Sequence, residues 1–194
     1  MTVVAQTTAR RPHRETILGV DPGSIFTGWG LVELEGSQLR HVANGIIGTS
    51  TALGQAERLR QIHCGIEEII RQYRPGAVSL EKVFFSHNAQ SALKLGQARG
   101  MAMLAAAQNQ IDVSEYSATE IKVAVVGYGH ATKEQIQKMV SALLGLRGAL
   151  RADAADALAA AICHIHRRTY QTRIAMGRAV KAKWRDYPKI AAKR

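Results

Sequence analysis

Four acidic residues occupy positions where a fold displays a side chain rather than burying it. Asp21 ends a short apolar run and is followed at once by Pro22-Gly23, and Glu81 ends a second apolar run. Asp153 and Asp156 are three residues apart near the start of an Ala-rich segment, so a helix there puts both on one face. Carboxylates gathered in this way repel one another, and divalent cations relieve that repulsion. The pattern predicts a metal-dependent phosphodiesterase site.

The ligand types indicate which metal such a site would hold. Oxygen ligands without paired His or Cys favour Mg²⁺, with Mn²⁺ as a substitute, over Zn²⁺. Two ions about 4 Å apart would orient the attacking water and stabilise the leaving oxygen. We therefore expect two Mg²⁺ ions per active site, bound by the same four acids that carry out catalysis.

Each acid also has a non-catalytic interpretation. Asp21 before Pro-Gly is typical of an Asx turn, and Glu81 would suit a solvated strand end. Asp153 and Asp156 would complement a helix dipole, which is a frequent use of acids in a first turn. Each interpretation is reasonable for one acid alone. Together they are less convincing, because all four acids would have to occur in this distinctive sequence context without a shared function.

The net charge of +11 on this 194-residue chain is concentrated toward its ends. Residues 167–194 hold ten Lys or Arg against one Asp, and residues 1–16 hold three Arg against one Glu, whereas residues 17–166 are neutral overall. This distribution predicts a polyanionic partner, although basic tails also aid solubility alone. No apolar run has the length of a membrane span, so we expect no membrane partner and a cytoplasmic location.

Hydrophobic periodicity predicts a mixed sheet covered by helices. Strands are expected at residues 16–21, 26–35, 38–48, 76–81 and 111–116. Helices are expected at residues 53–73, 88–109, 118–125, 133–145 and 151–168, with capping-box patterns at the start of the third and fourth. Three antiparallel strands followed by alternating helices and strands indicate an α/β fold, a five-stranded mixed sheet with helices on both faces. Open sheets of this kind place sites beyond the carboxyl ends of strands, where Asp21 and Glu81 fall.

The context of the acids adds a family resemblance. The stretches are Ile17-Leu-Gly-Val-Asp-Pro-Gly-Ser24 with Thr27-Gly-Trp-Gly30, Leu80-Glu-Lys-Val-Phe84, Ser91-Ala-Leu-Lys-Leu-Gly-Gln-Ala-Arg-Gly100 and Ala152-Asp-Ala-Ala-Asp-Ala-Leu158. In this order they resemble RuvC, the family of bacterial Holliday-junction resolvases, over about residues 16–166. Trp29 stands where a Tyr is common in the family.

The resemblance implies an RNase H-like fold and a homodimer that nicks two strands of a four-way DNA junction symmetrically, in recombination and repair. It implies that Asp21, Glu81, Asp153 and Asp156 are the metal-binding catalytic acids, and that the branch-migration proteins RuvA and RuvB are partners. We accordingly divide the chain into a basic N-terminal extension (1–15), a nuclease domain (16–168) and a basic C-terminal tail (169–194).

The resemblance also implies roles for residues outside the acidic quartet. Lys122 and Lys133 would contact a phosphate or stabilise developing charge, and Phe84 would stack on an unpaired base. Solvated lysines and a core aromatic are the ordinary alternatives. The possible dimer helix carries Asn88, Leu93, Gly96 and Gly100, although a helix-to-sheet contact within one chain explains the same glycines.

Three other classes of function share some of these sequence features. Actin-like ATPases share the Asp-x-Gly start, but they need a second similar domain for which 194 residues leave no room. A related RNase H-like nuclease that processes RNA and a non-catalytic junction-binding protein remain as alternatives. The intact acidic quartet argues against the last of these.

Overall fold

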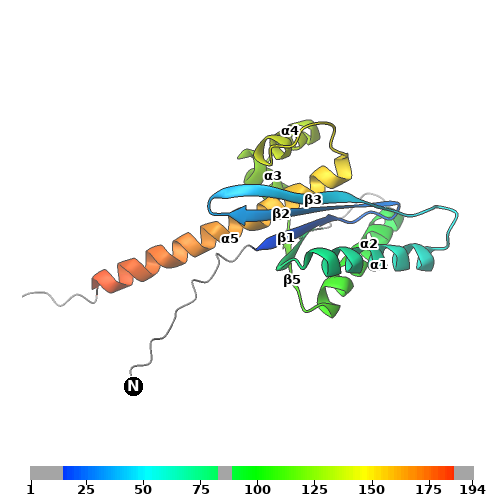
Figure 1. Cartoon of the computed structure of the whole chain (residues 1–194), viewed down its shortest axis with the longest axis horizontal. Coiled ribbons are helices and arrows are strands. Elements are labelled where there is room, and N and C mark those ends of the chain that lie inside the picture. The colour runs from blue at the N-terminus through cyan, green and yellow to red at the C-terminus, as the bar shows by residue number, and fades with distance from the viewer. Residues whose placement is uncertain (1–14, 83–88, 186–194) are drawn as a thin grey trace, which may run out of the picture.

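A five-stranded mixed sheet forms the centre of the computed structural model, which describes residues 15–82 and 89–185 (Figure 1). Its strands run in the spatial order β3-β2-β1-β4-β5. They are β1 (Thr16–Asp21), β2 (Phe26–Glu35), β3 (Gln38–Gly48), β4 (Ala77–Glu81) and β5 (Asp112–Tyr116). The expected five-stranded mixed sheet is confirmed.

The directions of the strands decide which of their ends meet. β1, β2 and β3 pair antiparallel, whereas β4 is parallel to both β1 and β5. Val20 is in register with Leu80, so the carboxyl ends of β1 and β4 lie at the same edge of the sheet. The next residues along these strands are Asp21 and Glu81.

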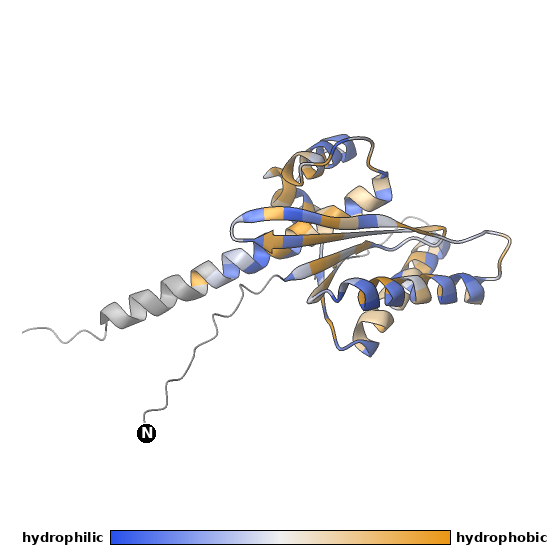
Figure 2. Cartoon of the chain, in the orientation of Figure 1, coloured by the Kyte–Doolittle hydropathy of each residue, from blue (hydrophilic) through white to orange (hydrophobic). Residues whose placement is uncertain are grey.

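Helices cover both faces of the sheet, as the periodicity predicts. α1 (Gln55–Tyr73) and α2 (Ala89–Gln108) lie on one side, and α3 (Ala118–Val126), α4 (Lys133–Leu143) and α5 (Ala152–Arg185) lie on the other (Figure 1). Figure 2 shows apolar residues concentrated in the central strands, while α1 alternates between polar and apolar positions. The capping boxes expected at the starts of α3 and α4 are both formed.

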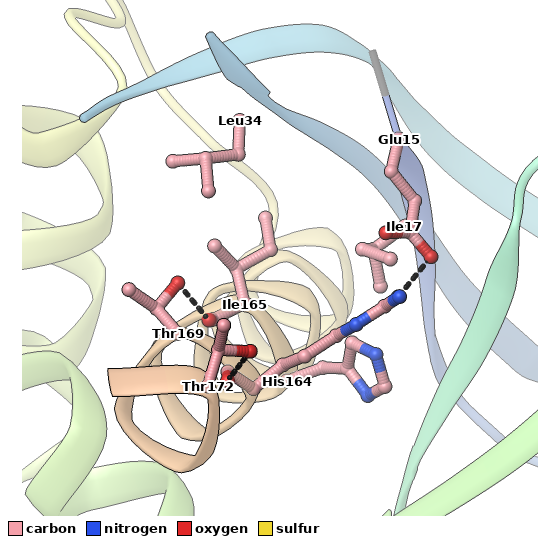
Figure 3. Close-up of a pocket in the computed structure, with 8 residues that line it drawn as sticks. Glu15, Ile17, Leu34, His164, Ile165, Thr169 and Thr172 are labelled. Carbon is pink, nitrogen blue, oxygen red and sulfur yellow. Dashed lines mark hydrogen bonds and ion pairs between the residues drawn. The ribbon is translucent and has the colours of Figure 1, made fainter. Parts of the chain in front are cut away.

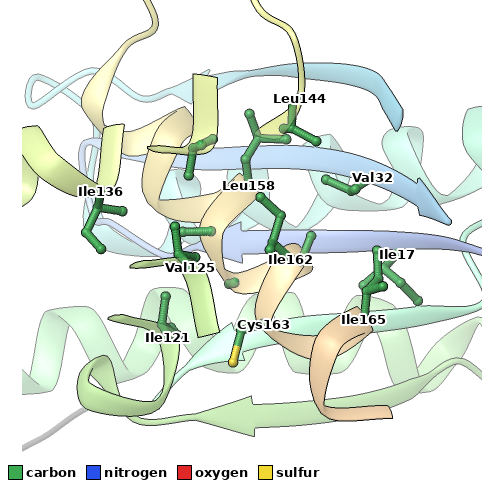
Figure 4. Close-up of a cluster of buried hydrophobic side chains, with 14 of the residues drawn as sticks. Ile17, Val32, Ile121, Val125, Ile136, Leu144, Leu158, Ile162, Cys163 and Ile165 are labelled. Carbon is green, nitrogen blue, oxygen red and sulfur yellow. The ribbon is translucent and has the colours of Figure 1, made fainter. Parts of the chain in front are cut away.

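Alternation along β1 divides the core into two clusters. Leu18 and Val20 face the α1–α2 side, where they meet Ile62 and Ile66 of α1. Ile17 faces the other side, where the buried cluster is built mainly from α3, α4 and α5 (Figure 4). Both clusters are therefore anchored on the strand that ends at Asp21.

α5 packs against the sheet at unusually short range. A Cβ atom added to Gly19 of β1 would lie 1.8 Å from the carbonyl oxygen of Ala157, and one added to Gly28 of β2 would lie 2.0 Å from that of Asp153. Glycine at these two positions lets the helix backbone contact the strands directly. This approach fixes the first turns of α5, and with them Asp153 and Asp156, against the carboxyl end of β1.

The expected end of the last helix at residue 168 is wrong, because α5 continues to Arg185. The charged composition beyond that residue suggested a tail. However, residues 169–185 are rich in Ala, Arg, Lys, Met and Gln, which favour helix, and contain no proline. Figure 1 shows this part of α5 extending beyond the sheet.

We expect Gly19→Ala to lower the free energy of unfolding by about 1–3 kcal/mol or more, since the added methyl group meets backbone that has no room to move. Urea denaturation checks this. Gly48→Ala is the matched control, because its Cβ would meet only Phe26 at 3.8 Å and should change stability little. Equal stability of the two variants would contradict the close packing of α5.

Candidate active site

Asp21 and Glu81 lie side by side at the carboxyl ends of β1 and β4. The register of the two strands requires this, because Val20 and Leu80 are paired one residue earlier. The pairing of β1 with β4 therefore makes these two strand-end acids neighbours.

The first turns of α5 bring the second pair of acids to the same place. Asp153 lies in the first turn, and its backbone contacts Gly28, the residue that pairs with Asp21 across β1 and β2. Asp156 lines a pocket of about 370 Å³ together with Asp21 and Glu81. Three separate elements thus deliver carboxylates to one edge of the sheet.

Burial and the close approach of these acids raise the pKa of Asp21 and of Glu81. Burial, and then the negative charges of Asp156, Glu81 and Asp153, raise the pKa of Asp21 to about 7 from its ordinary value of 3.8. Burial and the charge of Asp156 also raise the pKa of Glu81. A carboxylate whose charge is disfavoured by its neighbours gains from a bound cation.

Two lysines partly compensate this negative charge. Lys133, at the start of α4, donates from Nζ to Oδ2 of Asp156 at 2.9 Å. This hydrogen bond, together with the charge of Asp156, raises the pKa of Lys133. Lys122 of α3 lines the same pocket, and its charge opposes the rise in the pKa of Glu81. The structure therefore brings both predicted lysines to the acids.

The remaining walls of the pocket were not predicted from the sequence. Ala118 and Ile121 of α3, Ile136 of α4 and Ala159 of α5 enclose the carboxylates with apolar surface. Their apolar side chains reduce access of water and so contribute to the raised pKa of Asp21.

The segment after Asp21 is held in place by hydrogen bonds that the sequence did not reveal. The fully buried Thr27 donates from Oγ1 to the Gly23 carbonyl at 2.9 Å. Arg58 of α1 and Thr49 both donate to the carbonyl of Ser24. Thr27 belongs to the Thr27-Gly-Trp-Gly30 stretch quoted above, but nothing in that stretch indicates that its hydroxyl binds the Gly23 carbonyl.

The chemistry of the donor set fits a divalent cation. Asp21, Glu81 and Asp156 supply carboxylate oxygens around one pocket, which are the ligands that Mg²⁺ and Mn²⁺ prefer. Within residues 15–82 and 89–185, however, no group of three or more Asp, Glu, His or Cys side chains is drawn close enough together to hold a metal ion. Asp156 is paired with Lys133 instead. A cation bound here would therefore compete with Lys133 for Asp156.

The residues predicted for the dimer helix and for base stacking are not among the described residues that line the acidic pocket. Leu93 of α2 is 68% exposed, and Cβ atoms added to Gly96 or Gly100 would meet nothing within 4 Å among residues 15–82 and 89–185. Packing among these described residues therefore does not explain the two glycines. Phe84 and Asn88 lie outside the described residues.

Residues 17–164 match the family described as crossover junction endodeoxyribonuclease RuvC. The crossover junction endodeoxyribonuclease RuvC of Geobacter sulfurreducens is 54% identical over 148 residues, 76% of this chain and 90% of that protein. The RuvC protein of Trichlorobacter lovleyi is 51% identical over 176 residues, which cover 88% of this chain and 98% of that protein.

The chain belongs to the RuvC family.

Solved structures agree with this membership. Thermus thermophilus RuvC in complex with Holliday junction substrate superposes with a TM-score of 0.78 at 34% identity, covering 81% of this chain and 97% of that one. The yeast mitochondrial Holliday junction resolvase Ydc2 has a TM-score of 0.62 at 12% identity over 88% of this chain and 85% of its own, which shows a shared fold. The expected RNase H-like fold of the RuvC family is confirmed. No helix in the described parts of this chain is both long and apolar enough to cross a membrane.

The raised pKa of Asp21 predicts how stability depends on pH. Asp21 binds a proton more tightly in the folded chain, with a pKa of about 7, than in the unfolded chain, with its ordinary pKa of 3.8. Its stabilising contribution is therefore complete below about pH 4 and is lost as the pH rises through about 7. Without divalent metal, we expect Asp21→Asn to be more stable than the parent at pH 8 by on the order of 2 kcal/mol, and to differ less at pH 5.

Urea denaturation in EDTA at pH 5 and pH 8 measures this difference. Asp112→Asn, which changes an exposed acid at the start of β5, is the matched control and should follow the parent at both pH values. An Asp21→Asn variant with the parent's pH dependence would show that the acids do not destabilise the metal-free site.

Proposed function

We propose that this RuvC-family chain resolves four-way DNA junctions by metal-dependent hydrolysis of two phosphodiester bonds, one in each of two strands. The observation that carries the proposal is the pocket lined by Asp21, Glu81, Asp156, Lys122 and Lys133. It lies in a chain that is 54% identical over 148 residues to a crossover junction endodeoxyribonuclease. A cluster of raised-pKa carboxylates beside lysines suits phosphoryl transfer.

The four acids would hold two divalent ions, Mg²⁺ or Mn²⁺, which when bound activate water and stabilise the leaving oxygen. Among the four acids, Asp21 would gain strongly from a bound cation, since the charges of the other three acids all act on it. Glu81 would hold the pair from the β4 side, and Asp153 and Asp156 from the α5 side. Burial of Asp21 at the strand end limits its freedom and so orients its oxygens.

The lysines would act on the DNA phosphate. Lys133 is 71% exposed and paired with Asp156 through one of its three donors. Once a cation neutralises Asp156, this ammonium group is free to contact a non-bridging oxygen of the scissile phosphate. Lys122, on the α3 wall of the same pocket, would contact the phosphate from the other side. Phe84, just beyond the β4 end, would stack on a base at the junction centre.

Symmetric cutting requires two active sites, and the exposed side of α2 supports a homodimer. Leu93 and Leu104 are 68% and 45% exposed, and no atom in the described part of the chain lies within 4 Å of a Cβ position at Gly96 or Gly100. Small residues between exposed leucines allow a second helix to approach closely. Asn88 would lie at the start of this dimer helix.

The proposed activity suggests roles for the basic extensions, the partner proteins and the compartment. The basic residues outside 17–166 would contact the arms of the junction without reading sequence. The nuclease domain (16–168) would then be flanked by the two basic extensions. RuvA and RuvB, as branch-migration proteins, would supply the junction, and the cytoplasm would be the compartment because it holds bacterial DNA.

The proposal is tested by incubating the chain with a labelled four-way DNA junction, a linear duplex and an RNA–DNA hybrid, each with Mg²⁺ or Mn²⁺. We expect paired nicks in the junction alone. Asp21→Asn should lower the rate by at least a hundredfold while junction binding persists, since loss of a direct metal ligand should cost at least the roughly 10–100-fold of an outer-shell one. Asp112→Asn, an acid far from the site, should cut like the parent.

The other outcomes separate the alternatives. Cleavage of the hybrid alone would move the chain to RNA processing. Binding of the junction without cleavage in either metal would leave a junction-recognition protein and overturn the proposal.

The dimer makes a separate prediction. Leu93→Arg should shift the mass measured by analytical ultracentrifugation from dimer to monomer and replace paired nicks by slow single nicks, because a charge is placed in the apolar contact. Met139→Arg, at an exposed apolar position of α4, is the matched control and should stay dimeric. A dimeric Leu93→Arg variant would exclude this face of α2 as the interface.

A further inference from the structure

Figure 3 shows a second pocket. It lies at the start of β1, at the opposite end of that strand from Asp21. It has a volume of about 270 Å³ and is bounded by the start of β1, the end of β2 and the middle of α5. Its apolar walls are Ile17, Leu34 and Ile165. Ile17 is four residues before Asp21 on β1, which places the two sites roughly 13 Å apart along the strand.

A buried histidine in this pocket has an unused ring nitrogen. His164 of α5 is 6% exposed, and its Nε2 atom is excluded from solvent with no hydrogen-bond partner in the described parts of the chain. The other nitrogen, Nδ1, lies 3.1 Å from the hydroxyl of Tyr116. Burial, together with the charge of Arg168, lowers the pKa of His164, so the ring is neutral at physiological pH.

The tautomer of this neutral ring follows from its neighbours. Burial raises the pKa of Tyr116, so its hydroxyl keeps its proton. A phenol hydroxyl is a good donor and the bare nitrogen of a neutral imidazole is a strong acceptor, so Tyr116 donates its proton to Nδ1. The proton of the imidazole lies on Nε2, which is a buried donor that lacks an acceptor.

Arg168 supplies a second donor and a positive charge beside His164. It forms an ion pair with Glu15 across the mouth of the pocket, and its side chain is 55% exposed. A guanidinium group has five N–H donors, so the ion pair leaves capacity for another acceptor. The hydroxyls of Thr169 and Thr172 already donate to carbonyls of α5, at 2.8 Å and 3.0 Å.

We propose that this pocket binds a small monocarboxylate with an apolar body, whose carboxylate accepts from His164 Nε2 and from Arg168 while its body packs on Ile17, Leu34 and Ile165. The ligand reaches Nε2 by moving the exposed Arg168 side chain. A single negative charge suits the site better than a phosphate dianion, because Glu15 already places one carboxylate at the mouth. The size of the pocket limits the ligand to about ten non-hydrogen atoms.

Binding of 3-phenylpropanoate to the ¹⁵N-labelled full-length chain, followed by nuclear magnetic resonance, tests this proposal. We expect a dissociation constant on the order of 1 mM. The His164 Nε2 resonance and the amides of Ile165 and Thr169 should shift, because they border the ligand. The neutral isostere 3-phenylpropanamide should bind at least tenfold more weakly, since it lacks the charge that Arg168 recognises.

Two arginine variants locate the interaction. Arg168→Met should weaken the binding of 3-phenylpropanoate at least tenfold. Arg167→Met removes the neighbouring arginine, which pairs with Glu120 outside the pocket, and should bind like the parent. Absence of binding at 20 mM, equal affinity for acid and amide, equal affinity of the two variants, or shifts confined to other parts of the chain would each overturn the proposal. None of these results depends on the nuclease activity.

Discussion

The contact of α5 with β1 and β2 is the constraint on which the acidic site depends. Parallel pairing of β1 with β4 brings Asp21 and Glu81 together, but Asp153 and Asp156 reach them only because the helix backbone lies against Gly19 and Gly28. Any side chain at those glycines would lift the start of α5 and with it half of the carboxylates. Backbone geometry, set by two residues without side chains, thus determines where charge is gathered.

The gathered charge has an energetic cost that the core must offset. The pKa of Asp21 stands near 7 because burial and three neighbouring acids disfavour its charged form. The apolar clusters on both faces of β1 hold the strand in place despite this repulsion. The ion pair between Lys133 and Asp156 reduces this repulsion in the metal-free site. A divalent cation bound by the carboxylates would take over that role from Lys133.

Much of this arrangement could be predicted from the sequence, and the reasons are local. Strand ends, capping boxes and the 3.6-residue period are properties of neighbouring residues, so the strands and the helices followed from them. The pairing of β1 with β4, which makes Asp21 and Glu81 neighbours, joins segments far apart in the sequence. The pocket walls Ile121 and Ile136, the approach at Gly28 and the buried His164 depend on contacts between distant segments, which periodicity does not encode. The end of α5 was missed because a basic composition is compatible with either a tail or a helix.

Anomalous diffraction from crystals soaked in Mn²⁺ would test most directly whether the four acids form a metal centre. The account predicts two peaks about 4 Å apart, bounded by Asp21, Glu81, Asp153 and Asp156, with Lys133 withdrawn from Asp156. Asp21→Asn crystals should lose at least one peak. A site without manganese while Lys133 stays on Asp156, or manganese bound only elsewhere, would contradict the account.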